Sequence, residues 1–391
     1  MRRRNTIFNQ VVQLLSHSGF MRIVNRYDGD KYTKRLDCRQ QLLIGLYAQI
    51  KELVSLRDIE TSLKSHSDKW HHIGLESVAR STLADANAER PSEIFGELFY
   101  AFLEKCQRIA PRHRYRFEAS VFSFDSTLIG LCMTSFPWAK FRKRKGAMKL
   151  HMLLNHDGYL PSFIAMTDGK CHDVQLSKDP QHGLPKLPPD SILTIDRGYI
   201  DFGWLYQLHN QGTTFIVRTK SNMAYDVAGQ HKPASKRLGV LKDELIDLKN
   251  FYQDESYPES LRLIRFYDKE ENVELEFLTN NLKLAATTIA RLYKGRWQIE
   301  IFFKWIKQHL RVKTFIGTSK NAVMTQVWIA MILYLLLSFI KFQTKYASSL
   351  LELLRVIREL VWDTRSFLEV LRVNFEELQS MHSMPVQMAF Y

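Results

Sequence analysis

The chain has 391 residues, of which 45% are apolar and 12% aromatic, and this composition excludes a disordered protein. Its formal net charge is +14, because 55 Lys and Arg residues outnumber 41 Asp and Glu residues. So basic a chain favours a polyanionic partner; nucleic acid is the commonest, and an anionic membrane is the rival. The four cysteines have no Cys-x-x-Cys spacing, which argues against a zinc ribbon and fits a reducing cytoplasm.

The first 111 residues have apolar positions at helical spacing, and we expect helices there. Two of these segments, 55–66 and 77–90, are joined by a short polar connection, and the second displays Ser, Arg, Thr, Asp and Asn side chains. This order is compatible with a helix-turn-helix that presents a recognition helix to DNA, although an ordinary helical hairpin has the same pattern. A further helix is expected over residues 93–109. We therefore interpret residues 1–111 as a helical DNA-binding region.

From residue 112 the pattern changes to short apolar runs rich in β-branched and aromatic residues, which predict strands. The expected elements are a strand over 116–131, two strands within 151–167 joined by an Asp-Gly turn, a strand within 191–200, a helix over 202–210 and a strand over 213–220. This order predicts a mixed α/β sheet.

Residues 221–282 again have the alternation of strands, and we expect a β-rich insertion there. From residue 285 to about residue 379 the chain is predicted to be helical. The longest apolar run is 327–340, and its 14 residues fall short of the ~20 that a helix needs to span a bilayer. We therefore predict a buried helix and no association with a membrane.

Three acids lie on separate predicted elements. Asp125 lies inside an apolar strand, where a carboxylate is unfavourable unless it is paired or binds a cation. Asp196 ends another apolar strand, and Glu300 lies on a predicted helix. Carboxylates are the ligands that Mg²⁺ prefers, and two such ions about 4 Å apart activate a water and stabilise the leaving oxygen of a phosphoryl transfer. In a basic chain, these acids suggest phosphodiester chemistry on DNA.

The segment Leu292–Leu310 places Tyr293, Arg296, Glu300 and Lys307 at offsets of 0, 3, 7 and 14. Because an α-helix turns roughly 100° per residue, these positions fall within an arc of roughly 60° on one helix face. The alternative interpretation is a solvated face on which the charged side chains simply pair with each other.

Together the acids and this spacing resemble a known family. Asp125 on a first strand, Asp196 after a fourth strand and Glu300 on a following helix are similar to the DDE triad of transposases with a ribonuclease-H-like core. The Tyr-(2)-Arg-(3)-Glu-(6)-Lys spacing matches the Y-R-E-K signature of one bacterial insertion-sequence subgroup, whose β insertion before the Glu is also similar. Further agreement comes from Lys149-Leu150-His151 and from Asp196-Arg197-Gly198-Tyr199. The resemblance covers about residues 112–345.

Residue by residue, the resemblance implies that Asp125, Asp196 and Glu300 are catalytic and bind Mg²⁺, with Mn²⁺ as the alternative ion. It implies that the Tyr, Arg and Lys of the signature contact DNA phosphates. That role suits the planar donor fork of Arg and the point charge of Lys.

The resemblance also implies the organisation of the chain. A ribonuclease-H-like core is expected over 112–220 and 283–345, with the β-rich insertion at 221–282 and a C-terminal helical tail at 346–391. The implied partner is double-stranded DNA, at the transposon ends and at the target, with a homodimer in the synaptic complex. The expected location is the bacterial cytoplasm, in association with the nucleoid.

A basic run at residues 140–145 contains Arg142, Lys143, Arg144 and Lys145. Near an acidic metal site, such a run is interpreted as a loop that follows DNA phosphates, although a solvated loop is the alternative.

The sequence therefore predicts a DNA transposase that binds terminal inverted repeats and catalyses strand cleavage and strand transfer. Two other functions remain open: a catalytically inactive DNA-binding protein derived from a transposase, and a structure-specific endonuclease on the same fold.

Overall fold

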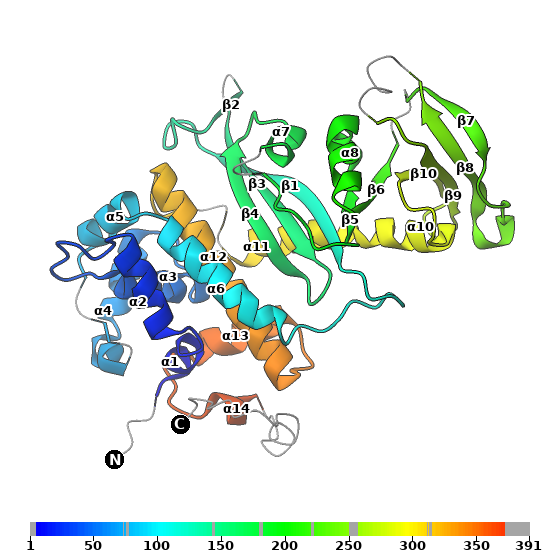
Figure 1. Ribbon diagram of the computed structural model, residues 1–391. Helices are drawn as coiled ribbons and strands as arrows, with labels where there is room; N and C mark the ends of the chain where they lie inside the picture. The colour runs from blue at the N-terminus through cyan, green and yellow to red at the C-terminus, as the bar shows by residue number, and fades with distance from the viewer. Residues whose placement is uncertain are drawn as a thin grey trace. The chain divides into compact units, whose positions relative to one another are not determined.

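The computed structural model describes residues 5–72, 74, 75, 78–142, 145–179, 183–219, 223–249, 257–310, 312 and 315–371. The chain folds into two compact units, whose helices and strands are labelled in Figure 1. The first is mainly helical and comprises Met1–Pro111, Thr134–Trp138 and Trp305–Tyr391; the second holds the sheet and comprises Arg112–Met133 and Ala139–Lys304. The predicted domain boundaries at residues 111, 220, 282 and 345 do not coincide with the boundaries of these two units, except at residue 111. The predicted domains therefore stay a prediction.

Most helices of the first unit begin directly after a short polar side chain. Before α4 (Leu56–Lys64), the Ser55 hydroxyl accepts a hydrogen bond from a backbone N–H of the first turn at 3.1 Å. Before α3 (Cys38–Ile50), Asp37 and Gln40 form a reciprocal capping box. Such caps satisfy N–H groups that have no partner within the helix. The other helices of this unit are α1 (Ile7–Val12), α2 (His17–Arg26), the 3-10 helix η1 (Ser67–His72), α5 (Arg80–Glu89), α6 (Glu93–Gln107), α12 (Lys320–Thr344), α13 (Leu350–Glu359) and α14 (Phe367–Val370).

The helices predicted over 55–66 and 93–109 are confirmed as α4 and α6. The helix predicted over 77–90 is α5, which begins only at Arg80, and residue 77 lies outside the described residues. The helical segment predicted from residue 285 consists of separate helices, and its end at residues 372–379 also lies outside the described residues.

Helix α12 is the centre of the first unit, and it contacts α3, α5, α6 and α13. Two glycines allow close packing against it. A Cβ at Gly45 of α3 would lie 2.6 Å from Ile329 Cδ1, and a Cβ at Gly96 of α6 would lie 3.1 Å from Trp328 Cε2. N-terminal helices are therefore built around a helix from near the C-terminus.

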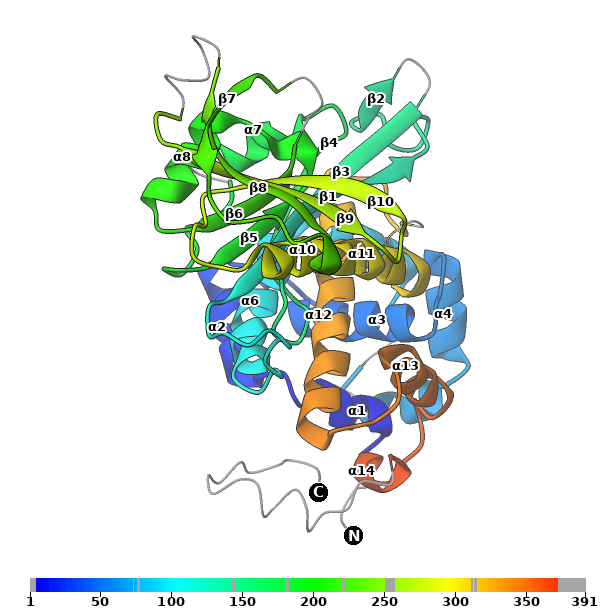
Figure 2. The ribbon, with the colours of Figure 1, turned by 90° about the vertical axis from the view of Figure 1, so that its right-hand side faces the viewer.

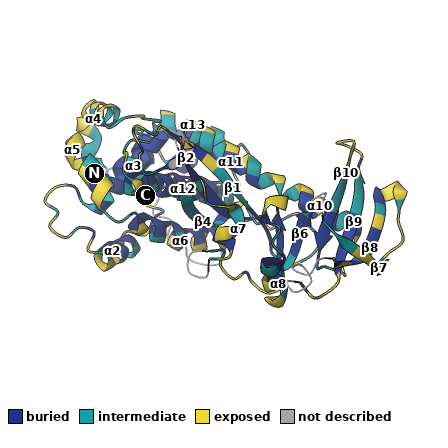
Figure 3. Ribbon diagram, turned by 90° about the horizontal axis from the view of Figure 1, so that it is seen from above, coloured by how far each residue is buried: buried dark blue, intermediate teal, exposed yellow. Residues whose placement is uncertain are grey.

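By length and composition, α12 is apolar enough to cross a membrane, with 25 residues and a mean hydropathy of 2.1 in its most apolar stretch. However, 94% of that stretch is buried within the protein, and α12 is largely dark blue in Figure 3. The predicted buried helix is confirmed, but the argument from length is wrong, because the helix extends beyond 327–340 in both directions. Burial, not length, distinguishes it from a membrane span.

The second unit contains one ten-stranded sheet, in the order β2-β3-β1-β5-β6-β10-β9-β8-β7, with β4 also paired to β3. Its strands are β1 (Val121–Leu131), β2 (Lys140–Arg142), β3 (Lys145–Asn155), β4 (Leu160–Asp168), β5 (Ile192–Ile195), β6 (Thr214–Arg218), β7 (Tyr225–Gln230), β8 (Val240–Leu248), β9 (Leu261–Asp268) and β10 (Val273–Thr279). Strand β1 is antiparallel to β3 and parallel to β5, and β5 is parallel to β6. This confirms the predicted mixed α/β, ribonuclease-H-like sheet. The strands of the predicted insertion, β7 to β10, continue that sheet beyond β6.

The two faces of the sheet carry separate cores. The helical elements in this part of the chain are α7 (Asp173–Ser177), η2 (Arg197–Tyr199), α8 (Phe202–Asn210), η3 (Lys236–Leu238), α10 (Ala286–Gly295) and α11 (Trp297–His309). Along β1, Phe124 points toward the face that packs with α8, and Val121 toward the face that packs with α10, because alternate side chains of a strand lie on opposite faces. Helix α10 contacts β5, β6, β8 and β9 (Figure 2).

The basic run at 140–145 is not a loop throughout, and that prediction is wrong. Lys140–Arg142 forms β2, Lys145 begins β3, and Arg142 pairs with Lys145 in the ladder. Lys143 and Arg144 lie outside the described residues. A hairpin this short gives only a weak strand pattern, and no such pattern can be recognised in a run of consecutive cations.

A series of hydrogen-bonded polar side chains is buried on the face of the sheet that packs with α10. His156 Nε2 lies 2.7 Å from Ser123 Oγ, which lies 2.8 Å from Thr194 Oγ1, and the Thr194 hydroxyl donates to the Phe122 carbonyl at 3.1 Å. Burial, with a smaller contribution from the nearby His113, lowers the pKa of His156 to about 4. His156 is therefore neutral at pH 7.

Acid should destabilise the second unit through this histidine. Because its pKa is lower in the folded protein than its ordinary value of 6.5, the unfolded chain binds the extra proton and stability is lost as the pH falls from 6.5 toward 4. Between pH 7 and pH 4.5, we expect His156 to remove about 2 kcal/mol from the free energy of unfolding. Urea unfolding of His156→Gln over this range should show a shallower pH dependence. The exposed His17→Gln serves as the control, and equal slopes for the two variants would contradict the prediction.

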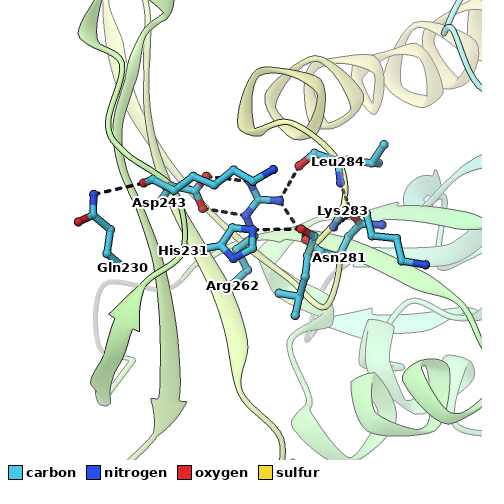
Figure 4. A network of polar contacts seen from close by, with 9 residues as sticks. Gln230, His231, Asp243, Arg262, Asn281, Lys283 and Leu284 are labelled. Atoms are coloured by element: carbon cyan, nitrogen blue, oxygen red, sulfur yellow. Dashed lines mark hydrogen bonds and ion pairs between the residues drawn. The ribbon is translucent and has the colours of Figure 1, made fainter.

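A buried ion pair joins the outer strands of the sheet to the start of α10 (Figure 4). Arg262 on β9 has a fully buried side chain and donates from Nε and Nη2 to the two carboxylate oxygens of Asp243 on β8, at 2.8 and 2.7 Å. Its Nη1 donates to the carbonyls of Asn281 and Leu284 at 3.1 and 2.6 Å. Each of its three guanidinium nitrogens therefore donates within the structure, and the turn before α10 is fixed to β9.

Candidate active site

Two of the predicted acids follow neighbouring parallel strands. The pairing of β1 with β5 ends at the residues directly before Asp125 and Asp196. Two residues earlier on the same strands, the hydroxyls of Ser123 and Thr194 contact each other. Because side chains two positions apart in a strand share a face, both aspartates point to the face covered by α10.

Arg296 connects the third acid to this pair of strands. Its Nη1 donates to Asp125 Oδ2 at 2.9 Å, and its Nη2 donates to Glu300 Oε1 at 2.7 Å. Only 11% of the Arg296 side chain is exposed, and its guanidinium carbon lies 5.7 Å from the centre of the Tyr293 ring. The structure thus brings Asp125, Glu300, Arg296 and Tyr293 together.

The single helix predicted over 292–310 is interrupted at Arg296. Helix α10 ends at Gly295 and α11 begins at Trp297, and the N–H of Ile299 donates to the Arg296 carbonyl three residues earlier at 3.0 Å. A Cβ at position 295 would collide with the Tyr115 hydroxyl, so a larger residue there would require the Tyr115 side chain to move. Tyr293 and Glu300 therefore lie on different helices, and the predicted common helix face is replaced by their shared contact with Arg296.

The groups around Asp125 shift its pKa in opposite directions. Burial raises the pKa of Asp125, and the negative charges of Asp196 and Glu300 add to this effect. Arg296 and the backbone N–H of Ser126 lower it, and the result is a pKa of about 6. The three acids are thus close enough to influence each other, and a cation among them is favourable.

A second polar cluster supports Asp125 from the opposite face of the sheet. The Ser126 N–H donates to Asp125 Oδ1 at 2.8 Å, and the Ser126 hydroxyl donates to Asp173. Lys149 Nζ lies 3.1 Å from the same Asp173 carboxylate and donates to the Cys171 carbonyl at 2.7 Å. One Asp125 oxygen is therefore held by Ser126 and the other by Arg296. Neither Ser126 nor Asp173 was predicted, because nothing in the sequence relates these distant positions.

The remaining predicted residues lie as follows. Lys307 is in the last turn of α11, two helical turns beyond Glu300. Arg142 and Lys145 are the paired backbone positions of β2 and β3. The roles of these residues stay predictions.

The acids are chemically suited to a divalent cation. Among the residues that the structure describes, no three His, Cys, Asp or Glu side chains form a ready metal-binding group. Instead, the Arg296 guanidinium lies between Asp125 and Glu300 as their counter-ion. The donors are hard carboxylate oxygens, and burial, with a smaller contribution from the charges of Asp196 and Glu300, raises the pKa of Asp125. A divalent cation fits this donor set provided that Arg296 moves aside.

Comparison with known proteins gives two family matches. Residues 116–336 match the model of a transposase DDE domain, and residues 3–76 match a domain of unknown function. A protein of Sinorhizobium fredii, y4zB, is named by inference as a transposase and is 33% identical over 67% of this chain and 71% of its own length. A protein of Geobacillus stearothermophilus, named by inference as the transposase of insertion sequence element IS5377, is 28% identical over 73% of each chain. A solved structure of a piggyBac transposase synaptic complex with hairpin DNA aligns at a TM-score of 0.49 and 10% identity, over 98% of this chain and 87% of that one.

Proposed function

Because this chain belongs to the transposase DDE domain family and is an enzyme of DNA transposition, we propose that it cleaves the ends of an insertion sequence and joins them to new DNA. The observation that carries this proposal is the contact of Arg296 with both Asp125 and Glu300, beside the strand end that Asp196 follows. Water would break a phosphodiester to leave a 3′ hydroxyl and a 5′ phosphate. The 3′ oxygen would then attack a second phosphodiester and release another 3′ hydroxyl.

In this proposal Asp125, Asp196 and Glu300 hold Mg²⁺, with Mn²⁺ as an alternative. When bound, the ions supply charge stabilisation for the attacking and leaving oxygens. Ser126 keeps Asp125 oriented through its N–H. Arg296 leaves the carboxylates for a DNA phosphate, because a guanidinium binds phosphate and carboxylate with the same donor fork.

The DNA partner is the double-stranded end of the element and its target. Tyr293 and Lys307 would contact phosphates with Arg296, and the cations at 142–145 would follow the backbone further along. Two ends must be joined, so we propose a homodimer in the synaptic complex, acting in the bacterial cytoplasm at the nucleoid. The net charge of +14 supports a polyanionic partner. Residues 1–111 would recognise the ends.

The test is cleavage of a labelled duplex taken from the DNA that flanks the gene. Purified full-length protein with Mg²⁺ should produce a new 3′ hydroxyl at the terminal repeat and join it to a target plasmid. Binding without cleavage would favour an inactive DNA-binding derivative. Cleavage of branched DNA of any sequence would favour a structure-specific endonuclease.

Arg296 gives a prediction for the protein without DNA. If its guanidinium competes with a divalent cation for Asp125 and Glu300, Arg296→Gln should tighten Mn²⁺ binding by about tenfold, because a positive charge leaves the site. Binding is measured by electron paramagnetic resonance of free Mn²⁺. The control is Lys294→Gln, since Lys294 pairs instead with Asp268 at 3.3 Å. Unchanged Mn²⁺ affinity in Arg296→Gln would contradict this competition.

A further inference from the structure

The N-terminal domain of unknown function contains an exposed loop between α2 and α3, residues 27–37, which we call the Tyr32 loop. The base of this loop is held by close packing and by hydrogen bonds. Gly29 is buried, its N–H donates to the Val24 carbonyl at 2.9 Å, and a Cβ there would collide with Ile94 Cδ1 at 2.6 Å. Asp30 Oδ1 accepts the Cys38 N–H at 2.7 Å.

The far end of the loop is fixed by an arginine from beyond α5. Arg90 donates from Nη2 to the Thr33 hydroxyl at 3.2 Å and to the Leu36 carbonyl. Its Nη1 donates to the Gln41 side chain at 3.0 Å. The segment between Gly29 and Leu36 is therefore presented from two anchored ends.

The tip of the loop holds an aromatic ring in solvent. Tyr32 is 89% exposed, and its backbone has a φ of +62°, a conformation that is strained for a bulky side chain. The Lys31 ammonium lies 5.7 Å from the centre of its ring. An exposed ring held in a strained conformation indicates a use outside the folded chain, since neither feature adds to stability.

Exposed cations lie close to this ring in the sequence, and the acids of the loop make contacts within the protein. Asp37 caps α3, and Asp28 is 3.5 Å from Lys31. Lys34 and Arg35 are exposed beside Tyr32. The tip thus combines an exposed aromatic ring with two further exposed cations, Lys34 and Arg35.

We propose that the Tyr32 loop is a DNA contact of this domain: Lys34 and Arg35 bind phosphates of the duplex, and the Tyr32 ring lies against a sugar or base between them. This rests on the proposed function, which requires DNA binding but does not specify the surface. The charges match a phosphate backbone, and an aromatic face packs on nucleotides without needing a particular sequence. A rigid loop also loses little conformational entropy on binding.

The experiment measures the affinity of full-length protein for a fluorescent 30-base-pair duplex of the terminal repeat, by anisotropy over a range of NaCl. Lys34→Ala/Arg35→Ala should weaken binding about tenfold and reduce the slope of log affinity against log salt by about 2, as expected for two lost phosphate contacts. The control is Arg355→Ala, which removes an exposed cation from α13.

The ring is tested separately. Tyr32→Gly should weaken binding by about fivefold or more while raising the thermal midpoint, because glycine accepts a positive φ without strain. A loss of affinity together with a gain of stability cannot come from misfolding. Tyr32→Phe should bind as the wild type does, since it keeps the ring.

Wild-type affinity in the double variant and in Tyr32→Gly would overturn the proposal. So would equal losses in Tyr32→Phe and Tyr32→Gly, or a loss in Arg355→Ala that matches the double variant. If the wild type cleaves the terminal repeat while the loop variants bind normally, only the loop assignment fails. If the wild type neither binds nor cleaves, the proposed function fails and the loop assignment with it.

Discussion

Alanine at Asp125, Asp196 or Glu300 should each lower strand cleavage by about 10³-fold or more while leaving binding of the transposon end within about twofold. The reason is that loss of one carboxylate removes a ligand from a site that must stabilise both the attacking and the leaving oxygen, and several kcal/mol of such stabilisation corresponds to several powers of ten in rate. Cleavage is measured on labelled end duplexes with Mg²⁺ and again with Mn²⁺. Binding is measured without metal.

A matched control is available on the same sheet. Asp226 on β7 is exposed and pairs with Lys249, so Asp226→Ala removes an acid without touching the site. It should cleave at the wild-type rate. Any one of the three site variants that does the same would be removed from the catalytic set. A loss of both binding and cleavage would indicate a structural role.

The largest effect on stability is expected at Arg262. Arg262→Met should lower the free energy of unfolding by about 3–5 kcal/mol, because it leaves the Asp243 carboxylate buried without its partner. The double variant Arg262→Met/Asp243→Leu should recover most of this loss, since two apolar side chains of similar volume leave no buried charge. Urea unfolding of the wild type, both single variants and the double variant gives the coupling energy.

Arg265 lies on the same strand and provides the comparison. Its pair with Glu276 has a similar distance of 2.9 Å, but 40% of the Arg265 side chain is exposed. Arg265→Met should therefore cost at most about 1 kcal/mol. Equal costs at Arg262 and Arg265 would mean that burial does not determine the strength of these pairs.

The sequence predicted those parts of the sheet that depend on local patterns. The strand before Asp196 is apolar except for Thr194, as expected of a strand buried on both faces, and Asp157-Gly158 forms the turn between β3 and β4. Such features depend on a few neighbouring residues, and they are readable without knowing the fold.

Features that depend on distant residues were not predictable. Asp243 and Arg262 occur in strands whose charges could equally well face solvent, and only the pairing of β8 with β9 makes them a buried pair. The contact of Arg296 with Asp125 joins positions 171 residues apart. From the sequence, Gly295 weakened the prediction of a continuous helix, but nothing indicated that the arginine after it turns toward β1.

The position of α12 at the centre of the helical unit has a consequence for synthesis of the protein. Asn321 donates to the Asn87 carbonyl across 234 residues, and the apolar faces of α3 and α6 are covered by α12. At about 5–20 residues per second, a ribosome needs about 10 to 50 seconds to add that stretch. During this interval the N-terminal helices lack their core. A translation product that stops before residue 320 would therefore leave the apolar faces of α3 and α6 exposed.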